Sequence, residues 1–465
     1  MTELINIITS KPDWSTKINN KSIVEKWSTE LLKQDVDPII LTLVIKLLQN
    51  YKSESEYDDC DDYKWALKLG THPDDFSLAK DCKCKCKICE GAEGQDSYSD
   101  ESDSDDYAYR PTYTQPSECT CTESKLNQKK KTFMLKFMHL NNTLINQQVK
   151  HIFKHNVRYL EKTIPVDYHP GTNNQVINLV HPSMYCYVDS VTKTKQKMDS
   201  NILFQWLPAE FAVKHDKVSI NSYINNLDYE TNSELYGSIA TIFESFVPKF
   251  NHVLKVLHNT DRINNFKKLS DCQVIVKLAN TILTPESPEF PAGTWHLEGL
   301  PHEKIIATGI YYYEMKNITS NYLNFRSTIT DGSDVDYQQN CSEYVKKHYG
   351  FDDVDNTYNG HECIINLGRI KTKEDMCLVF PNFMQHRVSN FKLVDNTKIG
   401  TRKILVFFLI DPLERILSTA DVKPQQSLMT LDNAKIYREL LMFQRKYEVT
   451  DQNSFFERSW SLCEH

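Results

Sequence analysis

Two histidines and one acidic residue with the spacing of a metal site lie in the second half of this 465-residue chain. His296 and Glu298 form a His-x-Glu triplet, and His386 follows 90 residues later. Two imidazoles and one carboxylate bind one face of Fe(II) and leave three coordination positions open. Arg402 lies sixteen residues beyond His386, and its planar guanidinium suits the distal carboxylate of 2-oxoglutarate. Together the four residues predict a mononuclear iron site that uses a 2-oxo acid.

The triplet taken alone carries little information. With 15 histidines and 62 acidic residues, chance gives about two such triplets, and the second is His72-Pro-Asp74. His72 lies at the edge of a polar segment, whereas His296 precedes an apolar run at 305–313. A single histidine or strand-edge arginine is more often structural, so the order of all four residues along predicted strands is what indicates a site.

Short runs rich in Val, Ile, Tyr and Phe predict the strands that would position these residues. The runs are 273–278, 305–313, 362–367, 376–380 and 403–410. Strand alternation places Arg402 on one face with Ile404, Val406 and Phe408. We therefore expect an α+β fold whose C-terminal core, residues 266–424, is a double-stranded β-helix (a cupin-like jelly roll), with a polar insertion at 327–360.

Helices are expected on either side of that core. The N-terminal segment 1–51 predicts two, one opened by a capping box of Ser22 and Glu25 and one by Asp37-Pro38. The support region 125–265 predicts helices at 130–163 and 233–258, the second broken or kinked by Pro248. The C-terminal segment 425–465 predicts a helix at 431–447.

Residues 52–124 form an acidic, cysteine-rich insert with the composition of a largely disordered segment. Cys86 and Cys89 have the two-residue spacing of a zinc knuckle, and Cys119 and Cys121 would complete four thiolate ligands for zinc or copper. A redox-active cluster, or cysteines without a specific role, are the alternatives.

The formal net charge of −8 comes from two acidic stretches, 51–62 and 96–106, and the remaining chain carries +3. That near-neutral body gives no nucleic-acid signal. The sequence also has no signal-peptide pattern and no apolar run of membrane-spanning length. Thirteen cysteines without a small-scaffold framework favour a reducing compartment, so a cytoplasmic or nuclear location is expected.

Long strings around these positions resemble a largely fungal family, domain of unknown function 4246. They include Trp206-Leu-Pro-Ala-Glu-Phe211, Gly293-Thr-Trp-His-Leu-Glu-Gly299, Phe380-Pro-Asn-Phe-Met-Gln-His-Arg-Val388 and Arg402-Lys-Ile-Leu405. The resemblance covers roughly residues 130–465, with a weaker match to the N-terminal helices. The family's sequence pattern is itself similar to that of Fe(II)- and 2-oxoglutarate-dependent oxygenases.

That similarity implies a specific set of roles. His296, Glu298 and His386 would be metal ligands, and Arg402 would anchor 2-oxoglutarate. The partners would be O₂ and a small-molecule or protein substrate, which would be hydroxylated or demethylated. Glu298 departs from the pattern, because most such oxygenases carry Asp there.

Two other functions fit the sequence. A non-catalytic β-helix binding module would follow if the longer Glu298 side chain spoiled the metal geometry. A metal-handling or interaction protein would follow if the cysteine-rich insert were the active part.

Overall fold

The computed structural model describes residues 2–34, 36–50, 134, 136–142, 144–259, 268–328, 361–362 and 364–460. Its helices are α1 (Thr2–Thr9), α2 (Trp14–Lys17), α3 (Lys21–Leu32), α4 (Pro38–Gln49), α9 (Gln147–Thr163), α10 (Tyr229–Asn259) and α12 (Leu431–Phe456). Two short 3₁₀ turns, η1 (Pro301–Glu303) and η2 (Gln425–Ser427), are also present. None of the described helices is long and apolar enough to cross a membrane.

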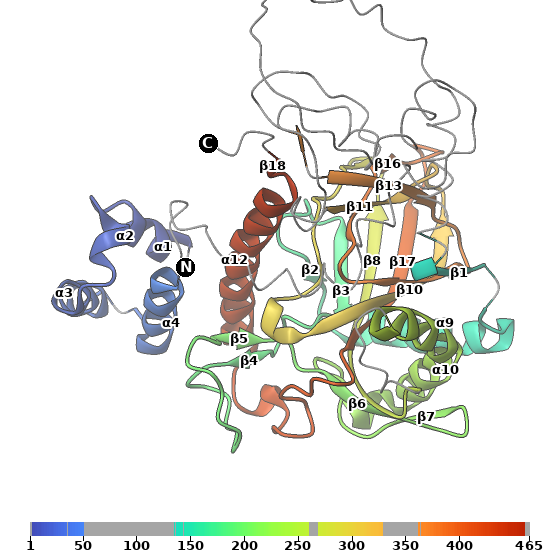
Figure 1. Ribbon diagram of the computed structural model, residues 1–465, viewed down its shortest axis with the longest axis horizontal. Coiled ribbons are helices and arrows are strands. Elements are labelled where there is room, and N and C mark those ends of the chain that lie inside the picture. The colour runs from blue at the N-terminus through green and yellow to red at the C-terminus, as the bar shows by residue number, and fades with distance from the viewer. Residues whose placement is uncertain are drawn as a thin grey trace, which may run out of the picture.

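A large antiparallel sheet forms the centre of the molecule (Figure 1). Its strand order is β1 (His139–Asn141), β14 (Cys377–Pro381), β10 (Ile305–Lys316), β17 (Gly400–Ile410), β8 (Asp271–Leu283), β3 (Val176–Val180), β2 (Asp167–Tyr168). The strand β6 (Ala209–Lys214) also pairs with β8, and β7 (Lys217–Ile220) extends it. The long central strands are apolar along almost their whole length, as expected of strands covered on both faces.

A smaller antiparallel sheet of β13 (Ile364–Lys371), β11 (Tyr322–Thr328) and β15 (Gln385–Val388) faces the large one. Phe325 of β11 packs edge-on against Phe380 of β14, with ring centroids 5.0 Å apart. The segment from β9 (Glu289–Phe290) to Glu298 runs beside β15 and β16 (Phe391–Lys392). From β8 to β17 the chain crosses repeatedly between the two sheets.

Helices α9 and α10 cover the face of the large sheet that points away from the small one (Figure 1). Phe243 and Phe246 of α10 pack against Phe407 of β17, with centroids 5.1 and 5.3 Å away. Gly309 of β10 lets this helix approach closely, because an added Cβ would lie 2.8 Å from Phe250. The mixed α/β expectation and the large antiparallel sheet are confirmed.

Three local predictions were wrong. Asn20, rather than a Ser22–Glu25 capping box, caps α3, since its side chain accepts from the Ser22 and Ile23 amides. The helix predicted at 130–163 is interrupted: residues 134, 136 and 137 are helical, but residues 139–141 pair with β14 as β1, and α9 begins at Gln147. Helix α10 is not broken at Pro248, and the residue inside it with non-helical backbone angles is Asn232.

Other local predictions were confirmed. Asp37 caps α4 by accepting from the Ile39 and Ile40 amides, with Pro38 at the first turn. All five predicted strand runs overlap strands of the structure. The C-terminal helix exists, capped by Thr430, and extends beyond the predicted end to Phe456.

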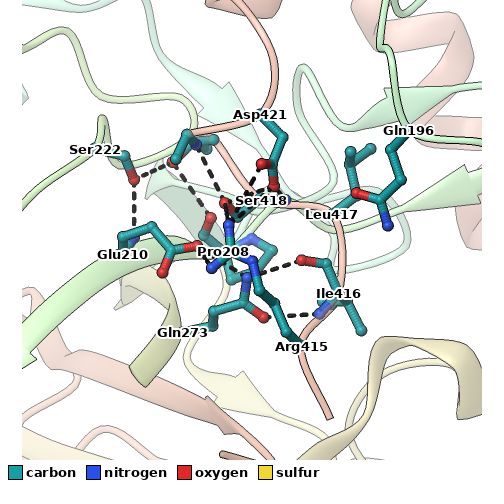
Figure 2. Close-up of polar contacts among 12 residues, drawn as sticks. Gln196, Pro208, Glu210, Ser222, Gln273, Arg415, Ile416, Leu417, Ser418 and Asp421 are labelled. Atoms are coloured by element: carbon teal, nitrogen blue, oxygen red, sulfur yellow. Dashed lines mark hydrogen bonds and ion pairs between the residues drawn. The ribbon is translucent and has the colours of Figure 1, made fainter. Parts of the chain in front are cut away.

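The chain after β17 is held to the large sheet by a polar network (Figure 2). Arg415 donates to Glu210 at 2.6 Å and also bonds Asp421. Gln273 of β8 exchanges hydrogen bonds with the main chain of Ile416. These hydrogen bonds fix the chain at the end of β17, which is the strand that carries Arg402.

We predict that Glu314 stabilises the contact between α9 and the sheet in a pH-dependent way. It is nearly buried, and it pairs with Lys154 of α9 at 2.5 Å and with Lys403 of β17 at 3.8 Å. Burial alone would raise the pKa of Glu314, but these lysines lower it from 4.5 to about 2. Glu314→Gln should therefore lower the free energy of unfolding by about 2 kcal/mol at neutral pH.

A depressed carboxyl pKa stabilises the fold above the unfolded value of 4.5, and that stability is lost as pH falls towards about 2. The difference between wild type and Glu314→Gln in urea unfolding should thus narrow below about pH 4.5. Asp216→Asn, which removes an exposed ion pair with Lys268, is the control and should change little. Equal stability of wild type and Glu314→Gln at pH 7 would contradict the prediction.

Candidate metal centre

His296, Glu298 and His386 come from two neighbouring segments that the fold joins through the main chain. His386 lies on β15, and His296 lies on the segment that runs antiparallel to it. The His296 amide donates to the His386 carbonyl at 3.2 Å, and the His386 amide donates back at 3.1 Å. This pairing brings the two imidazoles within 4.5 Å, centroid to centroid.

The three side chains converge on one point. One donor atom from each lies within 4.8 Å of the others. Glu298 Oε1 is 3.3 Å from His386 Nε2 and 3.7 Å from His296 Nε2. The longer carboxylate at 298 therefore still reaches both imidazoles. The side chain of His386 is 5% exposed, Glu298 15% and His296 33%, so the cluster is open on the His296 side.

Burial and mutual attraction set the charges of the cluster. Burial alone would raise the pKa of Glu298, but the two imidazoles hold it well below its usual range. Burial would lower the pKa of His296, yet its bond to Glu298 leaves that pKa raised. The pKa of His386 is lowered by burial and by the neighbouring His296. The cluster thus holds an ionised carboxylate beside two imidazoles.

The tautomer of His296 suits ligation. Its Nδ1 lies 2.9 Å from the Thr294 carbonyl, which can only accept, so Nδ1 carries the proton. When the ring is neutral, Nε2 is then left with the lone pair that a metal ion would bind. Such second partners of ligating histidines fix ring orientation in metal sites.

Two residues that the sequence did not single out hold the main chain between the ligands. Asn382 accepts from the Glu298 amide and donates to the Glu298 carbonyl, both at 2.9 Å, and also donates to Ile305. Gln452 of α12 accepts from the Leu297 amide at 3.0 Å. The only sequence signal was the place of Asn382 between two predicted site strands, since its partner lies 84 residues away.

The turn after Glu298 is fixed by a buried ion pair. Gly299 has φ +80°, and a Cβ there would lie 2.6 Å from Ile305. Glu303, fully buried, accepts from the Leu300 and Trp206 amides and pairs with Arg445 of α12 at 2.6 Å. Arg445 also stacks over Trp206 at 3.7 Å. The C-terminal helix therefore supports both ends of the ligand segment.

Arg402 lies on β17, with its side chain on the face that points towards the small sheet. It is 6% exposed and its guanidinium stacks over Tyr312 of β10, 5.0 Å from the ring centroid. No described residue accepts a hydrogen bond from its Nε. Of the three consecutive tyrosines, Tyr312 thus faces inward, whereas Tyr311 and Tyr313 pack against Phe153 of α9.

An aromatic and cationic frame surrounds the histidines. Phe380 and Phe325 contact the ring of His386, at 4.9 and 6.3 Å. Trp295, the neighbour of His296, lies between the guanidiniums of Arg326 and Arg387, 4.8 and 4.5 Å from its ring. Trp295 is therefore a packing residue.

The second metal site predicted from the sequence lies outside the described residues. Its zinc or copper ligands would be Cys86, Cys89, Cys119 and Cys121.

Three solved structures illustrate what the chain is similar to. An Fe(II)/α-ketoglutarate-dependent dioxygenase, TqaL, is 13% identical at TM-score 0.27, covering 58% of this chain and 92% of its own. A prolyl hydroxylase from Trichoplax adhaerens, in complex with a hypoxia inducible factor peptide, is 10% identical at TM-score 0.26, covering 64% and 96%. A Pseudomonas putida prolyl-4-hydroxylase is 5% identical at TM-score 0.26, covering 60% and 96%.

None of the curated proteins matches the sequence. The family model described as "Protein of unknown function (DUF4246)" matches residues 123–266 and 257–433, and the model of its N-terminal domain matches residues 1–30. These matches cover well over half of the chain and confirm the resemblance noted in the sequence. The chain belongs to the DUF4246 family.

Proposed function

We propose that this chain is an Fe(II)- and 2-oxoglutarate-dependent oxygenase. The observation that carries the proposal is the convergence of His296, Glu298 and His386 on one point, with donor atoms within 4.8 Å. Two imidazoles and one carboxylate with open positions are the donor set of non-haem Fe(II) oxygenases. The residues fit such an ion, because the carboxylate is ionised and the tautomer of His296 leaves a free ring nitrogen.

The strand arrangement supports a double-stranded β-helix as the finer description of the core. The sheet order β14–β10–β17–β8 on one side faces β13–β11–β15 and the His296 segment on the other. His386 and the His296 segment then lie at adjoining strands of the small sheet, while Arg402 lies on a central strand of the large one.

When bound, Fe(II) and 2-oxoglutarate would supply the oxidation: the 2-oxo acid loses CO₂ and becomes succinate with one atom of O₂, and the other atom enters a substrate C–H bond. Hydroxylation, or demethylation through a hydroxylated methyl group, would result. The substrate, a small molecule or a protein, is held by residues facing the open side of His296.

The protein's own groups would bind and orient these partners. Arg402 would pair with the distal carboxylate of the 2-oxo acid, and Tyr312 beneath it keeps the guanidinium flat against the sheet. Asn382 and Gln452 keep the Leu297 and Glu298 amides fixed, so the carboxylate keeps its direction. Phe325 and Phe380 exclude water from the inner side of His386.

Metal binding tests the donor set directly. Anaerobic titration with Fe(II), or with Mn(II) followed by electron paramagnetic resonance, should give one site per chain in the wild type. His386→Ala should lower the metal affinity by more than about 100-fold. That exceeds the loss usual for residues that only hydrogen-bond to a ligand. Arg387→Ala, which changes the neighbouring residue on β15, is the matched control. Metal retained in full by His386→Ala would exclude this centre.

Asn382→Ala tests the support of the Glu298 main chain. It removes three hydrogen bonds without touching a ligand side chain. We expect the metal affinity to fall about 10–100-fold, as it does for other residues that hold a ligand without binding the metal. The circular dichroism spectrum should stay that of the folded wild type. Unchanged metal affinity in a folded Asn382→Ala protein would show that Glu298 needs no such support.

The co-substrate is tested by the visible charge-transfer band that a chelated 2-oxo acid gives with Fe(II) under anaerobic conditions. The wild type should develop the band on titration with 2-oxoglutarate. Arg402→Met should raise the 2-oxoglutarate Kd by about tenfold or more, because a charge-assisted pair is lost. Bound iron without any band would favour a non-catalytic binding module instead.

A further inference from the structure

Lys277 is a cation on the inner face of the large sheet that the proposed chemistry does not use. It lies in the middle of β8, opposite Val406 of β17. Strand alternation puts it on the same face as Ile275 and Ala279. The pairing with β17 makes this the face of the sheet that also carries Arg402. Its ammonium group therefore points between the two sheets.

Electrostatic interactions place Lys277 beside the candidate metal centre. Burial lowers the pKa of Lys277, the Glu298 carboxylate acts in the opposite direction, and Arg445 and Arg402 lower it further. Lys277 in turn acts to lower the pKa of His296. Lys277 therefore lies near enough to Glu298 and His296 to interact with them electrostatically.

Several interior cations pair with carboxylates, whereas Lys277, Lys249 of α10 and Arg402 have no carboxylate partner among the described residues. Arg445 pairs with Glu303, Arg438 pairs with Asp167, and Lys150 pairs with Glu374, each at 2.6 or 2.7 Å. Lys277 forms no such hydrogen bond or ion pair. Because Lys277 is half-buried on the inner face of the sheet, its charge is available to a ligand that enters between the two sheets.

The charges around the candidate centre indicate which kind of ligand Lys277 would bind. A divalent metal, the Glu298 carboxylate, Lys277 and Arg402 would together carry three net positive charges. The two carboxylates of 2-oxoglutarate would neutralise two of them, one at the metal and one at Arg402. One positive charge beside the metal is left without a counter-ion, and it is that of Lys277.

We propose that Lys277 binds an anionic group of the primary substrate, a carboxylate or a phosphate, and so holds the substrate beside the metal. The inference rests on the proposed function and adds the substrate class to it. Lysine acts as a compact point charge towards such groups, whereas the planar fork of Arg402 suits the fixed carboxylate of the co-substrate. A neutral hydrocarbon substrate would leave Lys277 unpaired in the working complex.

The test uses the full-length protein loaded anaerobically with Fe(II) and 2-oxoglutarate, titrated with acetate and separately with inorganic phosphate. Calorimetry and the shift of the charge-transfer band report binding. The wild type should bind at least one of the two anions saturably, and the tighter one identifies the group. Lys277→Met should weaken that binding tenfold or more, Lys277→Arg should keep it within about threefold, and both variants should keep the 2-oxoglutarate Kd within about threefold.

Stability gives a second readout. Lys277→Met removes a half-buried charge that has no partner among the described residues, so its melting temperature should not fall below that of the wild type. A folded Lys277→Met that binds both anions like the wild type overturns the inference, as does a wild type that binds neither. Loss of 2-oxoglutarate binding in Lys277→Met would assign the lysine to the co-substrate instead.

The band measured before any anion is added separates the two proposals. Absence of the band in the wild type means that the proposed function fails, and the substrate inference fails with it. A normal band with no effect of Lys277→Met on anion binding means that only the substrate inference fails.

Discussion

The main-chain bridge between His296 and His386 is the contact on which the candidate centre depends. It joins residues 90 positions apart by two main-chain hydrogen bonds, so the backbones that carry the two imidazoles are held side by side. The carboxylate of Glu298, two residues along, is then directed to the same point. Since a metal site tolerates little change in donor geometry, the strands on both sides of this bridge must be held firmly.

Much of that support comes from the far end of the chain. Helix α12 contributes Gln452 to the Leu297 amide and Arg445 to the buried Glu303, and so brackets the ligand segment. Arg445 is fixed in turn by Trp206, whose indole donates to Ser183 at 2.8 Å. A buried ion pair is weak evidence for stability by itself. Here its geometry keeps the Gly299 turn in place and so holds the metal-ligand segment in position.

The sequence was most informative where local pattern and burial agree. The apolar runs of β8, β10 and β17 and the cap at Asp37 follow from residues close together in the chain. Prediction from the sequence failed where contacts between residues far apart in the chain determine the local structure. Residues 139–141 become a strand only because β14 offers a free edge, and Pro248 is accommodated within a helix packed against the sheet. The four candidate site residues could be named from their order. Asn382 and Gln452 could not, since their hydrogen-bond partners lie far away in the sequence, and neither could Lys277, since its place beside the candidate centre depends on the fold.

Interior charged residues fall into two groups: those paired with an opposite charge, which support the fold, and those without such a partner, which are available to bind a ligand. Glu303, Asp167 and Glu374 each meet a cation and accept further hydrogen bonds or lie at the rim, so these pairs are complete within the chain. Arg402 and Lys277 are cations on adjacent strands that face the same side and meet no carboxylate within hydrogen-bonding distance among the described residues. Their backbones are about 13 Å apart along the sheet, four strand residues, although their charges act on one another. Two unpaired cations at that separation suit two separate anions beside one metal better than a single small one, which is why a co-substrate alone does not account for both.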